Sequence, residues 1–222
     1  MNVPYGILIG GLGEYIDEYL SPLLTSAGYY VQIARGAAVV FSTLNRQTDL
    51  ALIDLPGSDH LDLLNALRTQ YPGTLVVLGP RHDRLVVTAF AQGVDDYVTR
   101  PFRADELMAR VRAQLRRWQR YAPPPFTLGP FGFDLAARTI TYHGRPLELD
   151  LSSFTLLSVL AEAPYRTFTP EELLASVWGR GQIHNLPLLA ATWQGLCQQI
   201  AGGPSTNVLV GDSYCGLALL RS

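Results

Sequence analysis

The first 120 residues alternate between short apolar runs and segments of helical spacing, and this alternation constrains the fold more than any other feature. Each apolar run has the length of a buried strand, and the segment after it carries apolar residues three or four apart. Strands and helices that alternate in this way form a parallel sheet with helices on both faces. The predicted strands are Tyr5–Ile9, Tyr29–Ala34, Leu50–Asp54, Thr74–Leu78 and Tyr97–Thr99. The predicted helices are Glu14–Ala27, Ala37–Leu44, Leu61–Thr69, Asp83–Gln92 and Ala104–Arg120.

The run Ala122-Pro123-Pro124-Pro125 ends this pattern. Consecutive prolines stop a helix and form a short, stiff spacer, because proline lacks a backbone N–H and restricts φ. We therefore expect residues 1–121 to form one domain, residues 122–125 a linker and residues 126–222 a second domain.

The second part of the chain has a different order of elements. Its first helix has a serine at the N-cap position, and the second begins with Thr169, Pro170 and Glu172, a strong helix-start pattern. The order of elements is typical of an α+β winged helix-turn-helix domain. The predicted elements are strands within Phe126–Leu149, helices Ser152–Ala163, Thr169–Trp178 and Pro187–Ile200, and a terminal hairpin of Val208–Val210 and Leu217–Leu220.

Composition excludes several classes of protein. Hydrophobic residues make up 48% and charged residues 16%, which is typical of a globular chain, and the net charge of −2 gives no overall attraction to nucleic acid or membrane. The cysteines Cys197 and Cys215 form no CxxC motif, and the histidines lack metal-ligand spacing. Without a signal-peptide pattern or a membrane-spanning apolar run, we expect a cytoplasmic protein that binds no metal or cofactor.

Two series of residues resemble the OmpR/PhoB-type response regulators. The series Val94–Phe102, followed by Glu106-Leu107 and Ala109–Arg112, is similar to the end of that family's receiver domain. The resemblance covers nearly the whole chain, and it implies a doubly wound receiver, a winged-helix effector and a role in transcription regulation within a two-component system. The segments that resemble the effector domain are Leu147–Leu149, Phe154–Leu157, Glu172–Leu174 and Val177–Gly179.

The resemblance implies a phosphorylation site at Asp54, where the third predicted strand ends. In the family an aspartate accepts the phosphoryl group, an acid pair binds the divalent cation, and a hydroxyl and a lysine complete the site. In this chain, Gly10, Gly11 and Leu12 stand where the acid pair is expected. Gly79 stands at the position of the hydroxyl, and Arg100 stands at the position of the lysine. Because octahedral Mg²⁺ needs several oxygen donors, we expect Asp54 to be a residual carboxylate paired with Arg100 rather than a live acceptor.

The loop Gly10–Gly13 also follows a strand and precedes a helix, as a nucleotide-binding loop does. It does not fit GxGxxG, and no acidic residue stands at the position that would bind a ribose. The alternative is a site closed by small residues, or one that holds an anion at the helix N-terminus.

The resemblance further implies a dimer formed through the fourth helix, fifth strand and fifth helix of the receiver. Asp96 and Arg110 keep one of the charged pairs that such dimers form between subunits, whereas two other pairs have lost a partner. In both of these pairs an apolar residue replaces the lost charged partner, so we expect the face to form a constitutive homodimer. The alternative is that these apolar side chains only cover the sheet. The residues expected at the interface are Asp96, Arg110, Val86, Phe90, Ala91, Glu106 and Arg112.

The third helix of the second domain contains no arginine or lysine. From Phe126 onward, five arginines stand against seven acidic residues, although winged helices bind DNA by neutralising phosphates. We therefore expect weak direct DNA binding. The candidates for contacts to DNA or to a protein partner are Thr192, Trp193, Gln194, Gln198 and Gln199, with the protein core as the simpler interpretation of Trp193.

Three functions are compatible with these features. The favoured one is a phosphorylation-independent transcription regulator that acts as a homodimer. The second is a protein-interaction module that has lost DNA binding. The third, a nucleotide-dependent enzyme, rests only on the glycine loop, and no catalytic residue is assigned.

Overall fold

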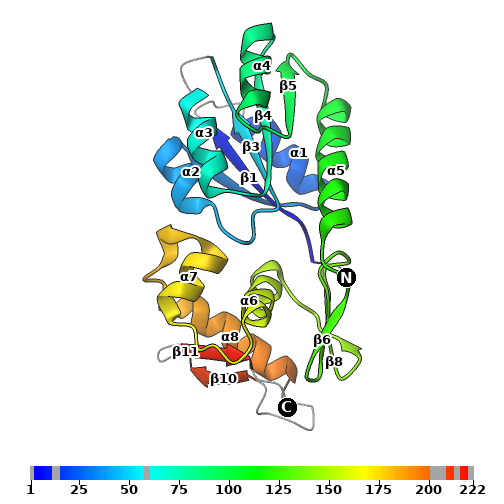
Figure 1. Cartoon of the computed structure of the whole chain (residues 1–222), viewed down its shortest axis with the longest axis vertical. Helices are drawn as coiled ribbons and strands as arrows, with labels where there is room; N and C mark the ends of the chain where they lie inside the picture. The colour runs from blue at the N-terminus through cyan, green and yellow to red at the C-terminus, as the bar shows by residue number, and fades with distance from the viewer. Residues whose placement is uncertain (1–2, 12–15, 58–60, 201–208, 213–215, 220–222) are drawn as a thin grey trace. The chain divides into compact units, whose positions relative to one another are not determined.

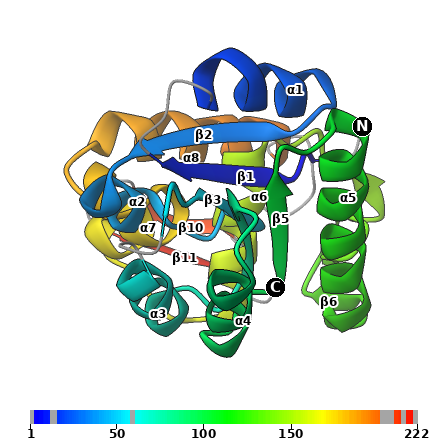
Figure 2. The same cartoon turned by 90° about the horizontal axis from the view of Figure 1, so that it is seen from above.

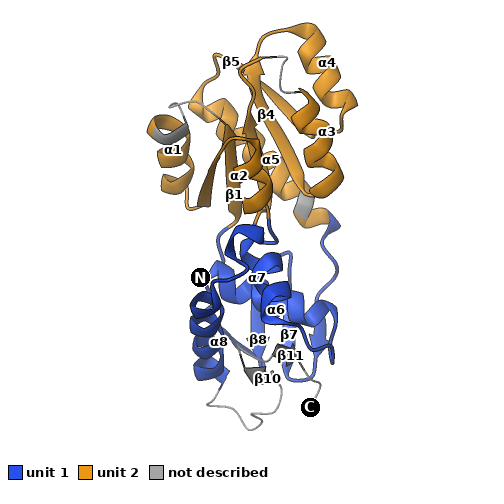
Figure 3. Cartoon of the chain, turned by 90° about the vertical axis from the view of Figure 1, so that its left-hand side faces the viewer, with its two compact units in different colours: residues 1–4, 45–47, 121–222 blue, residues 5–44, 48–120 orange. Residues whose placement is uncertain are grey.

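In the computed structural model, the described residues are 3–11, 16–57, 61–200, 209–212 and 216–219 (Figure 1). The chain divides into two compact units (Figure 3). The N-terminal unit comprises residues 5–44 and 48–120, and the C-terminal unit comprises residues 1–4, 45–47 and 121–222.

The N-terminal unit is built on a sheet of five parallel strands in the order β2-β1-β3-β4-β5. The register places Gly10 of β1 beside Ile53 of β3, and Asp54 of β3 beside Leu78 of β4. The predicted doubly wound, five-stranded sheet is confirmed, and its strands end at one edge, which we call the carboxyl edge. The strands are β1 (Gly6–Gly11), β2 (Tyr30–Arg35), β3 (Leu50–Asp54), β4 (Thr74–Pro80) and β5 (Asp96–Arg100).

Helices cover both faces of this sheet (Figure 2). Side chains of α1 and α5 pack against one face, and those of α2, α3 and α4 pack against the other. Successive strand residues alternate between the two cores, so that Ile7 and Ile9 belong to one and Leu8 to the other. The helices are η1 (Ile16–Leu20), α1 (Ser21–Ser26), α2 (Ala37–Thr43), α3 (Leu61–Gln70), α4 (Asp83–Ala91) and α5 (Ala104–Tyr121).

The predicted helix over Glu14–Ala27 is confirmed over Ile16–Ser26, and its first two residues lie outside the described part of the chain. The first part of this helix, Ile16–Leu20, is π-helical, and it continues without a break as an α-helix from Ser21, with Pro22 in the first α-helical turn. Pro22 has no backbone N–H to donate to the preceding turn, so one hydrogen bond of the regular ladder is missing there.

The C-terminal unit combines a four-stranded antiparallel sheet, three α-helices and a terminal hairpin, and residues of the sheet and the helices form one apolar core. This order of elements agrees with the predicted α+β winged-helix fold. Among the described residues of the chain, no helix combines the length and the apolar character needed to cross a bilayer. The elements are β6 (Phe126–Leu128), β7 (Phe131–Asp134), β8 (Thr139–Tyr142), β9 (Arg145–Pro146), α6 (Leu151–Glu162), α7 (Pro170–Trp178), η3 (Arg180–Gln182), α8 (Leu186–Ile200), β10 (Leu209–Asp212) and β11 (Gly216–Leu219).

One of the two predicted helix caps in this unit is confirmed and the other is wrong. The Thr169 side chain accepts a hydrogen bond from the Glu172 amide at 3.2 Å, and the Glu172 carboxylate accepts one from the Thr169 amide at 3.0 Å. Helix α6 is capped by Asp150, whose carboxylate accepts from the amide of Ser153 at 2.7 Å. Ser152 lies inside the first turn of α6, where its hydroxyl accepts from the indole N–H of Trp178.

Candidate functional site

Asp54 and Arg100 end two strands of the sheet and form an ion pair at its carboxyl edge. The Arg100 Nη1 atom lies 2.5 Å from Oδ1 of Asp54, and Nη2 donates to the Leu55 carbonyl at 2.8 Å. The Asp54 side chain is 6% exposed and that of Arg100 is 30% exposed. Burial raises the pKa of Asp54 above its usual value, and the Arg100 charge opposes this increase only in part. The carboxylate at the phosphoacceptor position is thus bound within the fold.

Gly10, the first of the three residues expected at the position of the acid pair, is closely packed against uncharged side chains. Gly10 and Gly11 end β1, whereas Leu12 lies outside the described residues. A Cβ atom on Gly10 would lie 2.7 Å from Cδ1 of Ile53 and 2.8 Å from Cγ2 of Val40. A carboxylate side chain at residue 10 would therefore displace core atoms, so the packing itself favours glycine.

Tyr97 of β5 takes the space beside Gly79, the position at which the resemblance implies a hydroxyl side chain. A side chain at Gly79 would overlap the Tyr97 hydroxyl, which donates a hydrogen bond to the Pro80 carbonyl at 3.0 Å. Tyr97 is 6% exposed, and burial raises the pKa of its phenol. Sequence reasoning did not identify Tyr97 as a site residue. The available signal was Gly79 itself, because glycine inside a strand often marks a close approach of another group.

The chain is 34% identical over 168 residues to the DNA-binding response regulator MtrA of Mycolicibacterium smegmatis, an alignment that covers 74% of each chain. It is 30% identical over 201 residues to the transcriptional regulatory protein AfsQ1 of Streptomyces coelicolor, which covers 89% of each. The chain belongs to the OmpR/PhoB-type response regulators. No protein-family model matches it. Among solved structures it is similar to the response regulator DrrB of Thermotoga maritima, with a TM-score of 0.44, 20% identity, and coverage of 98% of this chain and 100% of that one.

In this response regulator, the charged residues predicted at a dimer interface bind one another within a single chain. The Arg110 guanidinium lies 3.1 Å from Oδ1 of Asp96 and donates to the Glu106 carboxylate at 3.1 Å. The pairing of Asp96 with Arg110 therefore needs no second subunit.

The apolar residues on the same face, which include Val87 beside the predicted ones, differ in exposure. Val87 is 69% exposed and Phe90 47% exposed, and Ala91 is also at the surface. Val86 packs partly against the core, and Arg112 is exposed on α5. Helix α4 of this response regulator thus presents an apolar strip to solvent.

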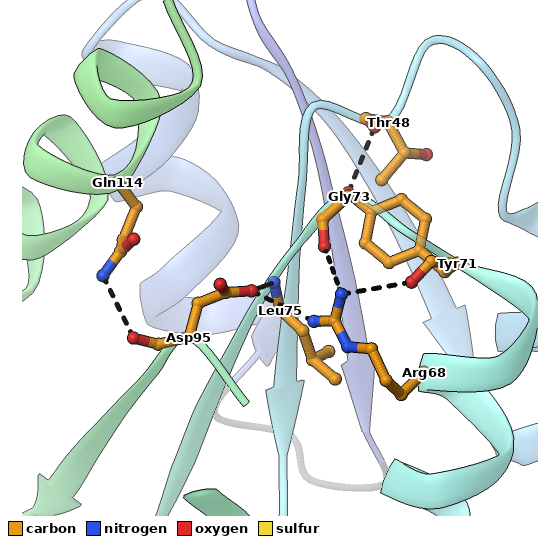
Figure 4. Close-up of polar contacts among 7 residues, drawn as sticks. All are labelled: Thr48, Arg68, Tyr71, Gly73, Leu75, Asp95 and Gln114. Carbon is orange, nitrogen blue, oxygen red and sulfur yellow. Dashed lines mark hydrogen bonds and ion pairs between the residues drawn. The ribbon is translucent and has the colours of Figure 1, made fainter. Parts of the chain in front are cut away.

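Asp95 does not belong to that strip but to a polar network at the opposite edge of the sheet (Figure 4). Its carboxylate accepts from Arg68 at 3.0 Å and from the Leu75 amide at 2.9 Å. Arg68 also donates to the Gly73 carbonyl at 2.9 Å, and Gln114 donates to the Asp95 carbonyl at 3.3 Å. The network joins the end of α3 to the starts of β4 and β5, an arrangement that sequence patterns did not predict.

The candidate contact residues of α8 fall into two groups. Trp193 is 8% exposed and packs in the core, so it is not available for surface contacts, and its inclusion among them is corrected. Thr192 is half-buried and donates its hydroxyl hydrogen to the Leu188 carbonyl. The remaining candidates, all exposed, are Gln194, Gln198 and Gln199, of which Gln199 donates to the Glu148 carbonyl.

Three of the described arginines in the C-terminal unit are engaged within it. Arg46 forms a 2.6 Å ion pair with Glu162. Arg138 is 4% exposed, donates to the carbonyls of Val3 and Pro4, and lies 5.1 Å from the ring centre of Phe154. Arg166 forms a 2.6 Å ion pair with Glu172. The exposed arginines without an ion pair or hydrogen bond to the described residues are Arg145 and Arg180.

Proposed function

We propose that this response regulator controls transcription without phosphorylation of Asp54. The observation that supports this proposal is the Asp54–Arg100 ion pair, in which the carboxylate that would attack phosphorus is buried and already bound by a guanidinium group. A nucleophilic carboxylate must be free to approach the phosphoryl donor, and breaking this pair would leave the buried charge uncompensated.

The described residues around the pair also offer no group of side chains that could hold a catalytic cation. Phosphoryl transfer depends on a metal ion that neutralises the phosphoryl oxygens, and Mg²⁺ requires several oxygen ligands. Among the described residues, no three histidine, cysteine or acidic side chains are grouped closely enough to bind a metal. A side chain at Gly10 would meet Ile53 at 2.7 Å and Val40 at 2.8 Å, so the first carboxylate of an acid pair would require these core side chains to move.

Intact-mass spectrometry after incubation with acetyl phosphate and Mg²⁺ tests the proposal. We expect no mass increase in the full chain, whereas a receiver with an intact acid pair, treated in parallel, should gain one phosphoryl group. A labile adduct that disappears in the Asp54→Asn variant would show that Asp54 is a live acceptor and would refute the proposal.

We further propose that the active form is a homodimer through α4, β5 and α5. The exposed Val87 and Phe90 supply the apolar contact that such an interface needs, while the Asp96–Arg110 pair orders the neighbouring surface. Since no phosphorylation is required, the dimer forms at all times.

For the C-terminal unit we propose direct but weak DNA binding. MtrA is named a DNA-binding response regulator, and the α8 helix offers Gln194 and Gln198 for contacts to bases. Arg145 and Arg180 are the described arginines of the unit that remain available for phosphates, so the electrostatic part of the affinity is small.

A further inference from the structure

A pocket of about 400 Å³ opens at the carboxyl edge of the N-terminal unit. It lies between the loop after β4 and the loop after β5, and its volume is at the small end of the ~300–1,000 Å³ typical of ligand sites. Three apolar residues and two arginines line it, a mixture that suits a ligand with both an apolar and an anionic part. The lining residues are Pro80, Arg81, Arg100, Pro101 and Phe102.

Arg100 is held in place at this pocket and keeps unused hydrogen-bond donors. Its guanidinium group carries five N–H donors, of which one bonds Asp54 and one bonds the Leu55 carbonyl. The other three have no partner among the described residues. Because the ion pair fixes the position of the group, a ligand that binds it need not order a flexible side chain.

Arg81 adds a second positive charge to the pocket, and Asp54, which pairs with Arg100, does not neutralise it. It is exposed, and within the described part of the chain it forms no ion pair or hydrogen bond. Arg103, the next arginine after Arg100, is neutralised by Asp105 through two contacts of 3.0 Å. The pocket therefore has an excess of positive charge that is concentrated at Arg81 and Arg100.

The other charged groups beside Arg81 leave this excess in place. His82 accepts a hydrogen bond from the Leu85 amide through Nδ1, as the N-cap of α4. Asp83 is exposed in the first turn of α4, where the partial positive charge of the helix N-terminus offsets its carboxylate.

We propose that this pocket binds a small organic anion, with its carboxylate or phosphate group between Arg81 and Arg100. The hydrophobic body of the ligand packs against Pro80, Pro101 and Phe102. Guanidinium groups bind both kinds of anion through charge-assisted hydrogen bonds, and the apolar walls distinguish such a ligand from an inorganic ion. The ligand would bind the N–H donors of Arg100 that do not contact Asp54. The proposed site is therefore a separate feature from the proposed lack of phosphorylation at Asp54, and it does not depend on that proposal.

The test is an NMR titration of the full-length protein with benzoate, with phenyl phosphate and with the neutral analogue benzamide. We expect saturable shifts of the backbone amides of Arg81 and Phe102 for the two anions and none for benzamide. Binding by either anion supports the site, and the tighter one identifies the preferred anionic group.

The Arg81→Gln variant should weaken binding roughly tenfold through loss of a charge-assisted hydrogen bond. Arg84→Gln is the matched control, because Arg84 is also exposed but does not line the pocket. Three results would each overturn the proposal: no saturable shift with either anion, equal binding of benzamide, or the same effect of both substitutions.

Discussion

Gly79 of β4 lies so close to the hydroxyl group of Tyr97 that any side chain at residue 79 would overlap it. The tyrosine hydroxyl occupies the space that a side chain at residue 79 would need, and it donates a hydrogen bond to the Pro80 carbonyl. A glycine in this strand thus permits the buried position of an aromatic ring on the next strand.

We expect the Gly79→Ser variant to expel the Tyr97 ring from its buried position. The substitution adds atoms to a filled space, which should lower the free energy of unfolding by about 1–3 kcal/mol. Fluorine NMR of protein labelled with 3-fluorotyrosine detects the displacement of the Tyr97 ring. The Tyr97 signal is the one that disappears in the Tyr97→Phe variant. Gly57→Ser is the control, because a side chain there would meet open space. An unchanged Tyr97 signal in Gly79→Ser would contradict the structure.

The stability of the N-terminal unit should depend on the ionisation of Asp54. Burial raises its pKa in the folded state above the ordinary value of 3.8, so the folded protein holds this proton more tightly than the unfolded chain does. The stability that this group contributes is therefore present below its unfolded pKa and is lost as the pH rises through the folded pKa.

The measurement is urea unfolding of the native protein and of Asp54→Asn between acidic and neutral pH. Relative to the variant, the native protein should lose stability as the pH rises from the ordinary aspartate range and then level off. If it gained stability instead, the attraction of Arg100 would outweigh the cost of burying the carboxylate.

A charge on the exposed strip of α4 should dissociate the proposed homodimer. Val87 is 69% exposed, so Val87→Asp should fold normally but place a desolvated carboxylate in the interface. Val39→Asp, on the exposed part of α2, is the matched control and should leave the dimer intact. Sedimentation equilibrium at micromolar concentration measures whether each variant is a monomer or a dimer. A monomeric native protein under these conditions would rule out the dimer.

DNA binding should depend only weakly on salt. With Arg145 and Arg180 as phosphate contacts, a plot of log affinity against log salt should have a slope of about −2 per subunit. This slope is measured by fluorescence anisotropy at several salt concentrations, with a DNA duplex that the full-length protein has selected from a random pool.

The Arg180→Gln variant should make that slope shallower by about one. Arg166→Gln is the control, since Arg166 is paired with Glu172. A slope several times steeper in the native protein would mean that other groups contact the phosphates.

Local chemistry in the sequence was sufficient to predict most elements of the fold. Apolar runs of strand length and the capping box at Thr169 depend on neighbours within a few residues, and both were confirmed. Where two residues could serve the same local role, the sequence was ambiguous: Asp150 and Ser152 are both cap-forming types, and the point at which the backbone becomes helical decided between them. The helical pattern that the sequence shows across Pro22 was also confirmed, but the π-helical geometry of Ile16–Leu20 was not predicted.

The candidate site depends on longer distances along the chain. The Asp54–Arg100 pair could be anticipated across 46 residues, because parallel strands bring their carboxyl ends to one edge. Which side chain fills the space above Gly79, whether Asp96 binds its own α5, and whether Trp193 faces solvent were decided only by tertiary packing. Sequence periodicity assigns a residue to a face of its own element, but the atoms that meet it come from elements whose distance and rotation only the assembled core determines.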